Sequence, residues 1–218
     1  MKRIKLVEQV AHLIAATKRT HPLRVAIDGV DAAGKTTLAN ELVGPLEKLK
    51  RPVIRASIDG FHNPRLIRYR RGKDSPEGYF YDSFDLEAMK TYLLKPLGPD
   101  GNGQYQTAVF DFRTDSRIFS AKQQAQTNSI LLFDGVFLLR PEIAGCWDFT
   151  VFLDVDFDVV IERAAQRDLA LFGSAEQTRE RYRTRYIPGQ KIYLNTCQPR
   201  ARADVLIDNN NPMTPRIL

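Results

Sequence analysis

The chain reads Gly29-Val30-Asp31-Ala32-Ala33-Gly34-Lys35-Thr36 between an apolar segment and a run of helix-forming residues. This order matches the phosphate-loop pattern G-x-x-x-x-G-K-[ST] at every fixed position. The glycines allow backbone N–H groups to curve around a triphosphate, Lys35 adds a compact positive charge, and the Thr36 hydroxyl suits Mg²⁺. We therefore predict that a nucleoside triphosphate, taken to be ATP, and Mg²⁺ bind here. The predicted cofactor-binding residues are Gly29, Asp31, Ala32, Ala33, Gly34, Lys35, Thr36 and Thr37.

Strand-like and helix-like segments alternate on both sides of this loop. Short apolar runs predict strands at 24–27, 52–57, 130–133, 150–153 and 205–207, with another at 104–112. Helical spacing predicts helices at 3–19, 35–49, 86–97 and 158–171, a mobile loop or helical turn at 65–77, and a frayed tail at 209–218. Alternation of this kind is typical of a parallel sheet. We predict a three-layer α/β P-loop NTPase fold with a central parallel sheet, helices on both faces and an arginine-rich lid.

The composition is that of an ordinary folded protein. The 218 residues are 43% hydrophobic and 27% charged, which fits one domain and excludes a mainly disordered chain. No apolar run approaches the roughly 18 residues of a membrane span, so we expect no membrane partner. The two cysteines, Cys146 and Cys197, form no disulfide framework, and we read no signal peptide after the basic start. Together these features favour a cytoplasmic protein.

An aspartate follows the second predicted strand, in the order Ser57-Ile58-Asp59-Gly60-Phe61-His62. In an open α/β sheet the carboxyl ends of the strands border the ligand crevice. A carboxylate there can accept a proton from a hydroxyl that attacks the γ-phosphate. The alternative is that Asp59 only opens a turn with Gly60. No guanine-reading N-K-x-D follows residue 100, which argues against a GTPase.

Three further motifs follow in the chain: Asp82-Ser83-Phe84-Asp85, Phe110-Asp111-Phe112 and Phe133-Asp134-Gly135. With the phosphate loop and the segment at Asp59, they resemble the group of uridine kinases, phosphoribulokinases and bacterial pantothenate kinases over residues 24–208. The resemblance implies that Asp59 is the catalytic base and that Lys35 holds the phosphates. It also implies that Thr36, Asp134 and Asp59 lie at the metal. The arginine-rich segment resembles the lid of that family, which implies that Arg163 and Arg167 stabilise the transferring phosphoryl group.

The resemblance implies one kinase domain over 1–218. Within it we distinguish an N-terminal helix (1–22), an acceptor-binding insertion (60–112), a lid region (163–190) and a tail (209–218). The expected acceptor is a small-molecule hydroxyl compound, first of all a nucleoside, with pantothenate, a sugar, glycerate or a nucleoside monophosphate as alternatives. The residues predicted to bind it are Phe61, His62, Asp82, Asp85, Phe110 and Arg113. The phenylalanines could instead pack in the core, and Asp85 could instead begin a helix.

The chain carries a formal net charge of +6 and a pI near 9.4. This charge suits a phosphate-rich small substrate as well as a nucleic acid. The rival interpretation is therefore a nucleic-acid-stimulated ATPase or a nucleotide-switched regulator. We expect a small-molecule kinase without a nucleic-acid partner, and a homo-oligomer is left open.

Overall fold

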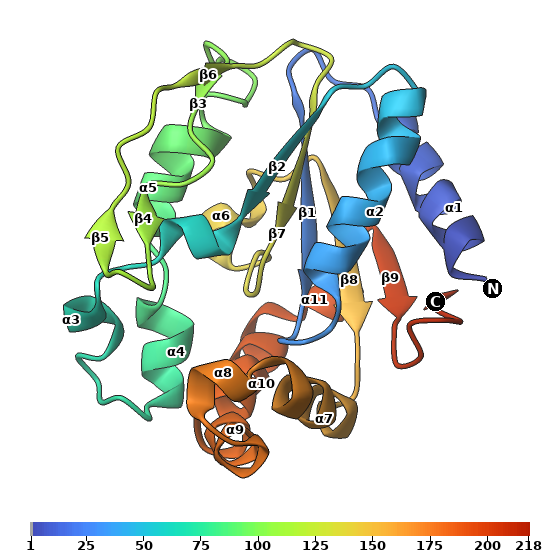
Figure 1. Ribbon diagram of the computed structural model, residues 1–218. Coiled ribbons are helices and arrows are strands. Elements are labelled where there is room, and N and C mark those ends of the chain that lie inside the picture. The colour runs from blue at the N-terminus through green and yellow to red at the C-terminus, as the bar shows by residue number, and fades with distance from the viewer. Residues whose placement is uncertain (1) are drawn as a thin grey trace.

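The computed structural model describes residues 2–218 and is built on a six-stranded sheet (Figure 1). The strands follow the order β10-β9-β8-β1-β7-β2, in which β10 alone runs antiparallel to its neighbour. Their bounds are β1 Leu23–Gly29, β2 Val53–Ser57, β7 Ile130–Asp134, β8 Phe149–Asp154, β9 Val205–Asp208 and β10 Arg216–Ile217. The five predicted core strands are therefore all present, within three residues of their expected bounds.

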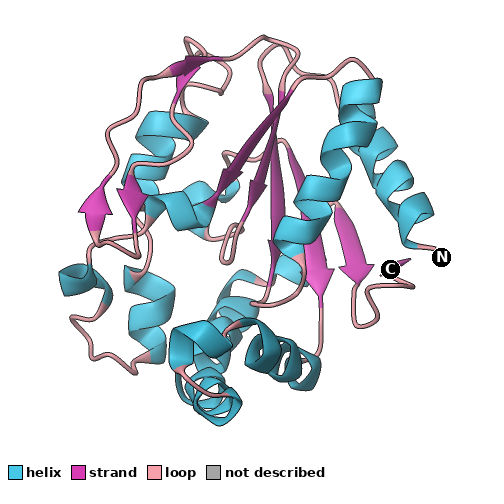
Figure 2. Ribbon diagram, viewed as in Figure 1, coloured by secondary structure: helices cyan, strands magenta, loops and turns pink. Residues whose placement is uncertain are grey.

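Helices cover both faces of the sheet (Figure 2). One face packs on α1 (Arg3–Ala16), α2 (Lys35–Lys48) and α7 (Phe157–Arg167). The other packs on α4 (Pro76–Asp82), α5 (Leu86–Met89), α6 (Pro141–Ala144) and α10 (Ile187–Cys197). Side chains alternate between the two layers, since Val25 and Ile27 belong to the first core and Ala26 to the second. The chain thus has the predicted three-layer α/β architecture.

The strand register brings three connections to one edge of the sheet. Ile27 of β1 and Ser57 of β2 both pair with Asp134, the last residue of β7. Because these strands are parallel, the loops that leave them all lie at the lower edge in Figure 1. Chemistry-bearing residues that are distant in the sequence therefore meet there.

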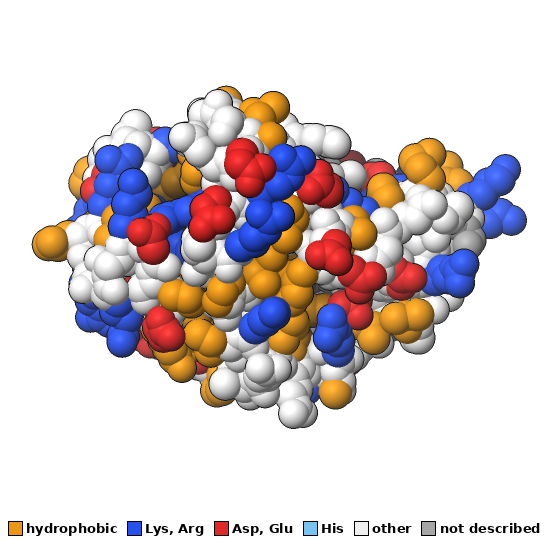
Figure 3. Space-filling model, turned by 90° about the horizontal axis from the view of Figure 1, so that it is seen from below, with side chains coloured by type: hydrophobic (Ala, Val, Ile, Leu, Met, Phe, Trp, Pro, Cys, Tyr) orange, Lys and Arg blue, Asp and Glu red, His pale blue; other side chains and the backbone are white. Residues whose placement is uncertain are grey.

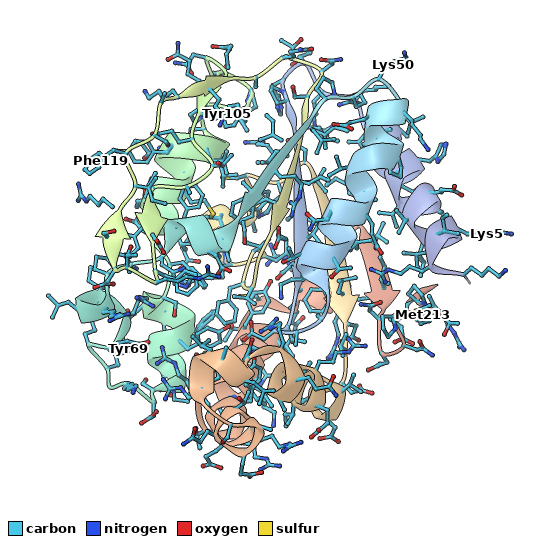
Figure 4. All side chains as sticks on the ribbon, in the orientation of Figure 1. Lys5, Lys50, Tyr69, Tyr105, Phe119 and Met213 are labelled. Carbon is cyan, nitrogen blue, oxygen red and sulfur yellow. The ribbon has the colours of Figure 1, made fainter. Side chains whose placement is uncertain are left out.

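The segment between β2 and β7 differs from the prediction. Residues 104–112 are not one strand: β3 (Gln104–Tyr105) pairs with β6 (Gln123–Gln124), and β4 (Phe110–Asp111) pairs with β5 (Ser116–Arg117). The chain turns between them because the Gln106 N–H donates to Tyr92 O and the Val109 N–H to Gly60 O. The remaining elements are the helical turns η1 (Ile58–Phe61) and η2 (Lys90–Leu94), and α3 (Arg65–Arg68). The helical turn predicted within 65–77 is α3. Phe119, labelled in Figure 4, lies exposed on the outer rim of this segment.

Two predictions for the C-terminal half are wrong. The helix expected over 158–171 is two helices, α7 and α8 (Leu169–Phe172), because the chain leaves helical geometry at Asp168. The tail is not frayed, since β10 pairs with the open edge of β9 and Asn209 is buried. Between these segments lie α9 (Ala175–Arg181), the turn η3 (Tyr182–Tyr186), α10 and α11 (Pro199–Arg202). No helix in residues 2–218 is long and apolar enough to cross a membrane.

Candidate active site

A cleft of about 560 Å³ lies at the carboxyl edge of the sheet, between the phosphate loop, η1 and the helices α7, α8 and η3. It brings together most of the polar residues that the sequence singled out. Those that line it are Asp31, Lys35, Thr36, Asp59, His62, Arg113, Asp134 and Arg167. Residues from five separate parts of the chain thus share one cavity.

The phosphate loop connects β1 to the N-terminus of the 14-residue helix α2. Gly34 caps this helix with a φ of 92°, a left-handed conformation that glycine adopts without strain. A Cβ on Gly29 would lie 2.6 Å from Leu153 O, so β8 can approach this closely only at a glycine. The loop amides and the positive end of α2 can receive an anion. Gly29, Ala32, Ala33, Gly34 and Thr37 lie in the loop and first turn without lining the cleft.

Lys35 lies at the base of the cleft and is nearly buried, with its Nζ donating to Val30 O at 2.7 Å. Burial lowers the pKa of Lys35, and the carboxylates of Asp31 and Asp28 oppose this shift. Asp31 accepts hydrogen bonds from Tyr79 of α4 (2.7 Å) and from Gln190 of α10 (2.8 Å). The loop is therefore fixed to two helices of the opposite layer before any phosphate binds.

Asp28 lies beneath the loop and is fully buried. Burial raises the pKa of Asp28 to about 6, although the Tyr193 hydroxyl and the Gly29 N–H (2.7 Å) both donate to its carboxylate. The strand predicted at 24–27 ends before Asp28, and no role was predicted for this residue, whereas β1 continues to Gly29 and is buried throughout. The available signal was an aspartate placed directly between an apolar strand and the phosphate loop.

Asp134 ends β7 and faces the first turn of α2. Its carboxylate accepts from the Thr36 hydroxyl at 2.6 Å and from Arg55 Nη2 at 2.7 Å. Mg²⁺ prefers oxygen ligands and keeps several waters, so a hydroxyl beside a carboxylate on a cleft wall fits this ion. The role of Arg55 was missed, because only the register of β2 against β7 brings it beside Asp134.

Asp59 follows β2 in the turn η1, where its backbone N–H donates to the Ser57 side chain at 3.4 Å. Its side chain is 63% exposed, and that exposed surface faces the cleft. Desolvation by the surrounding walls raises the pKa of Asp59. His62 opposes the shift, while Asp31 and Asp134 add to it. The carboxylate is accessible and more basic than an ordinary aspartate, which suits a group that accepts a proton.

His62 flanks Asp59, with its Nδ1 3.1 Å from Asp59 O. Its ring lies between Phe84 and Phe112, at centroid distances of 4.6 and 4.7 Å. Burial lowers the pKa of His62, and Asp59 opposes this shift. His62 is thereby held against the cleft wall in a fixed orientation.

Arg113 and Arg167, from distant parts of the sequence, both line the cleft. The Arg113 guanidinium lies over the Phe112 ring at 5.6 Å. Arg167 pairs with Asp168 through two bonds of 2.7 and 2.9 Å and also donates to the Tyr182 hydroxyl at 3.2 Å. Both guanidinium groups therefore border the cavity that a phosphate group would enter, and that of Arg167 is already paired with Asp168.

Three predicted acceptor residues are buried away from the cleft. Phe61 and Phe110 pack in the core and are 0% and 7% exposed, so the alternative of core packing holds in this structure. Asp82 is buried and is paired with Arg70 and Arg71, which neutralise its charge from outside the cleft.

Two further predicted site residues have structural contacts instead. Asp85 caps α5 by accepting from the Ala88 N–H at 2.8 Å, so the alternative role as a helix cap describes it. Arg163 points away from the cleft, because its Nη2 donates to Asn209 O and Asn210 O, both at 2.9 Å. Of the two lid arginines named from the sequence, only Arg167 lines the cleft.

The cleft also contains aromatic and apolar residues that the sequence analysis did not single out. No role in a cleft was predicted for them, because aromatic residues at helical spacing are typical of core positions. These residues are Tyr79, Phe84, Leu171, Phe172, Tyr182 and Tyr186. Within residues 2–218, no cluster of three or more His, Cys, Asp or Glu side chains is arranged to hold a metal by itself.

Known proteins resemble this chain over most of its length. It is 27% identical over 202 residues to uridine-cytidine kinase A of Dictyostelium discoideum, covering 87% of this chain. It is 26% identical over 188 residues to a pantothenate kinase of Rhodopseudomonas palustris, strain HaA2, covering 80% of this chain. The matched segments span only 38% and 58% of those two relatives, which are longer proteins.

Solved structures share the fold. A possible uridine kinase from Bacillus stearothermophilus superposes with a TM-score of 0.72 at 26% identity, covering 94% of this chain and 96% of that one. A putative fructose transport system kinase from Silicibacter sp. TM1040 gives 0.69 at 21% identity, covering 89% and 95%. The family model described as phosphoribulokinase / uridine kinase matches residues 25–210. The chain therefore belongs to the phosphoribulokinase / uridine kinase family of P-loop kinases.

Proposed function

We propose that the protein transfers the γ-phosphate of ATP to a hydroxyl group of a small molecule. The observation that carries this proposal is that one cleft contains both Lys35 of the phosphate loop and the accessible carboxylate of Asp59. A triphosphate held by the loop and a hydroxyl held at Asp59 would meet within this cavity. Positioning of two reactants in this way supplies much of the catalysis in phosphoryl transfer.

The phosphate loop holds the donor. The loop amides, the positive end of α2 and Lys35 bind the β- and γ-phosphates. Thr36 and Asp134 are the residues that would hold Mg²⁺, which shields phosphate charge when bound. Arg167 provides guanidinium N–H groups to the equatorial oxygens of the transferring phosphoryl group, where charge is spread in the transition state.

Asp59 acts on the acceptor. The acceptor oxygen forms a bond to the γ-phosphorus while the bond from that phosphorus to the β,γ-bridging oxygen breaks, releasing ADP. The hydroxyl proton passes to the Asp59 carboxylate, whose raised pKa favours its acceptance. Asp59 lines the same cleft as Thr36 and Asp134 and would also lie at Mg²⁺, the second role expected for it.

The acceptor expected first from the resemblance is a nucleoside, and pantothenate, a sugar, glycerate or a nucleoside monophosphate are the alternatives. The half-buried ring of Phe112 lines the cleft and offers a surface against which a base can stack. This contact supports a nucleoside or a nucleoside monophosphate as the acceptor.

The test is ADP formation from Mg·ATP with uridine, cytidine, pantothenate, ribose, D-glycerate, uridine 5′-monophosphate or single-stranded RNA. The mass of each acceptor compound is then measured by mass spectrometry. A gain of one phosphoryl group on the acceptor distinguishes transfer from hydrolysis of ATP. We expect at least one small hydroxyl compound to be phosphorylated, with ADP in equal amount. ADP formation stimulated by RNA alone, with no small molecule phosphorylated, would contradict the proposal.

A further inference from the structure

A second chamber of about 650 Å³ opens from the cleft, on the side of α3 and the segment that follows it. The two chambers share six lining residues, among them His62, Phe112 and Arg113. The two cavities therefore adjoin, and one molecule of moderate size could extend from Asp59 into the second chamber. Ligand cavities of this size are ordinary for small substrates.

The second chamber has a strongly cationic lining. Five basic side chains line it, and the only carboxylate among the described lining residues is Asp74, which pairs with Arg181. The cleft around Asp59, in contrast, contains four carboxylates and three cations. The basic residues of the chamber are Arg65, Arg68, Lys73, Arg113 and Arg181.

Several of these cations have no acidic partner. Within the part of the chain that the structure describes, Arg65, Lys73 and Arg113 form no ion pair. Arg68 is 7% exposed and pairs with Asp115 through one terminal nitrogen at 3.2 Å, while its Nε has no hydrogen-bond partner. A buried guanidinium with an unused donor is costly unless an anion comes near.

Arg185 adds a buried cation behind the wall of the chamber. It is 3% exposed, and its Nε has no partner among residues 2–218. Its guanidinium lies 4.9 Å from the ring centroid of Tyr69 and 5.7 Å from that of Tyr186, both of which line the chamber. Tyr69 is labelled in Figure 4, after α3. No carboxylate of the described residues pairs with Arg185, so its field adds to the positive potential of the chamber.

We propose that the second chamber binds an anionic group of the acceptor, a carboxylate or a phosphate, while the acceptor hydroxyl lies at Asp59. The acceptor is then one of the anionic alternatives, such as pantothenate, glycerate or a nucleoside monophosphate, rather than an uncharged nucleoside. This inference rests on the proposed phosphotransfer. Guanidinium groups match the planar carboxylate and the phosphate oxygens through paired N–H donors. Arg113 borders both chambers, so it contacts the acceptor between its anionic end and its reacting hydroxyl.

The first arm of the test measures anion binding without any reaction. Mg·ADP saturates the phosphate loop, and inorganic phosphate or malonate is then titrated by calorimetry. The double variant Arg65→Gln/Lys73→Gln is compared with Arg117→Gln/Lys122→Gln, a matched pair of exposed residues that do not line the chamber. We expect the first variant to bind at least tenfold more weakly and the control to bind as the wild type does. An absence of wild-type binding, or equal losses in both variants, would overturn the proposal.

The second arm measures phosphorylation of matched pairs that differ in the anion. The carboxylate pairs are D-glycerate with glycerol and pantothenate with panthenol. The phosphate pairs are ribose 5-phosphate with ribose and uridine 5′-monophosphate with uridine. We expect the anionic member of at least one pair to have a kcat/KM a hundredfold above its neutral counterpart, and the identity of that pair separates carboxylate from phosphate.

For that acceptor, Arg65→Gln/Lys73→Gln should raise KM at least tenfold and change kcat less than threefold. The reason is that the chamber binds the anionic end of the acceptor, away from the hydroxyl that reacts at Asp59. Preferential transfer to the neutral members would overturn the inference and leave the proposed phosphotransfer intact. Anion binding in the first arm, with no acceptor phosphorylated, would support the anion site and contradict the phosphotransfer.

Discussion

At the residue scale, the sequence predicted the groups whose roles depend on local motifs. Lys35, Thr36, Asp59 and Asp134 all line one cleft, as the order of their motifs indicated. Residues whose surroundings come from distant segments were predicted less well. Asp82 was predicted to bind the acceptor, but two arginines from the preceding loop pair with it instead. No local pattern reveals such a pairing.

Asp28 gives a residue-scale prediction about pH. The folded protein keeps a proton on this carboxyl up to about pH 6, whereas the unfolded chain loses it near 3.8. The folded state therefore binds more protons between these values, so the stability from this group is complete below pH 3.8 and is lost as pH rises through 6. We expect the free energy of unfolding to fall by about 2–3 kcal/mol more in the wild type than in Asp28→Asn between pH 4 and pH 7.

The measurement is urea unfolding of both proteins at each pH. Asp100→Asn, at an exposed turn, serves as the matched control and should follow the wild type. An equal pH dependence in the wild type and Asp28→Asn would show that Asp28 is ionised in the folded protein.

At the element scale, the core strands were predictable because each is a short, mainly apolar run, and the sheet buries both faces of β1 and β7. The elements between β2 and β7 were not, because their boundaries depend on backbone contacts with distant turns. The helices α9 and α10 were missed because charged and aromatic residues mask their periodicity. On the face shown in Figure 3, acidic and basic side chains are interspersed, in keeping with the pairing of Arg179 with Glu162 and Glu176.

The Tyr79 hydroxyl on α4 holds the phosphate loop through its hydrogen bond to Asp31. Tyr79→Phe removes the bond of 2.7 Å to Asp31, and burial holds the Tyr79 pKa well above its usual range, so the group remains a donor. A hydrogen bond to a charged group contributes about 1.5–3 kcal/mol. We expect chemical unfolding to show a loss in this range and calorimetry to show weaker binding of ATP.

Tyr81→Phe is the matched control, because Tyr81 lies half-exposed on the same helix and its hydroxyl has no hydrogen bond within residues 2–218. Equal effects of the two substitutions would mean that the hydrogen bond between Tyr79 and Asp31 contributes neither to the stability of the protein nor to its affinity for ATP.

At the scale of the whole molecule, Asn209 joins three distant parts of the chain. It is 2% exposed, its Nδ2 donates to Ala33 O at 2.7 Å, and its Oδ1 accepts from Arg3 at 3.2 Å. The phosphate loop is thereby connected to α1 and to the segment after β9. The sequence indicated the opposite, a frayed tail, because polar residues such as 209–211 are typical of loops.

We expect Asn209→Ala to lower the free energy of unfolding by about 1–3 kcal/mol, since it leaves a buried carbonyl without its donor. Binding of ATP should weaken in parallel. Thermal unfolding with and without ATP measures both effects, and Asn195→Ala, at an exposed position of α10, is the control. A variant as stable as the control would show that the C-terminal segment is independent of the loop.

The proposed phosphotransfer depends most on Asp59 accepting the proton of the acceptor hydroxyl. The most direct measurement is single-turnover formation of phosphorylated acceptor by wild type and Asp59→Asn, with the affinity for Mg·ATP measured separately by calorimetry. We predict that the variant binds ATP within threefold of the wild type and transfers phosphate about 10²–10⁴-fold more slowly. A transfer rate equal to that of the wild type, at unchanged ATP affinity, would contradict the role of Asp59.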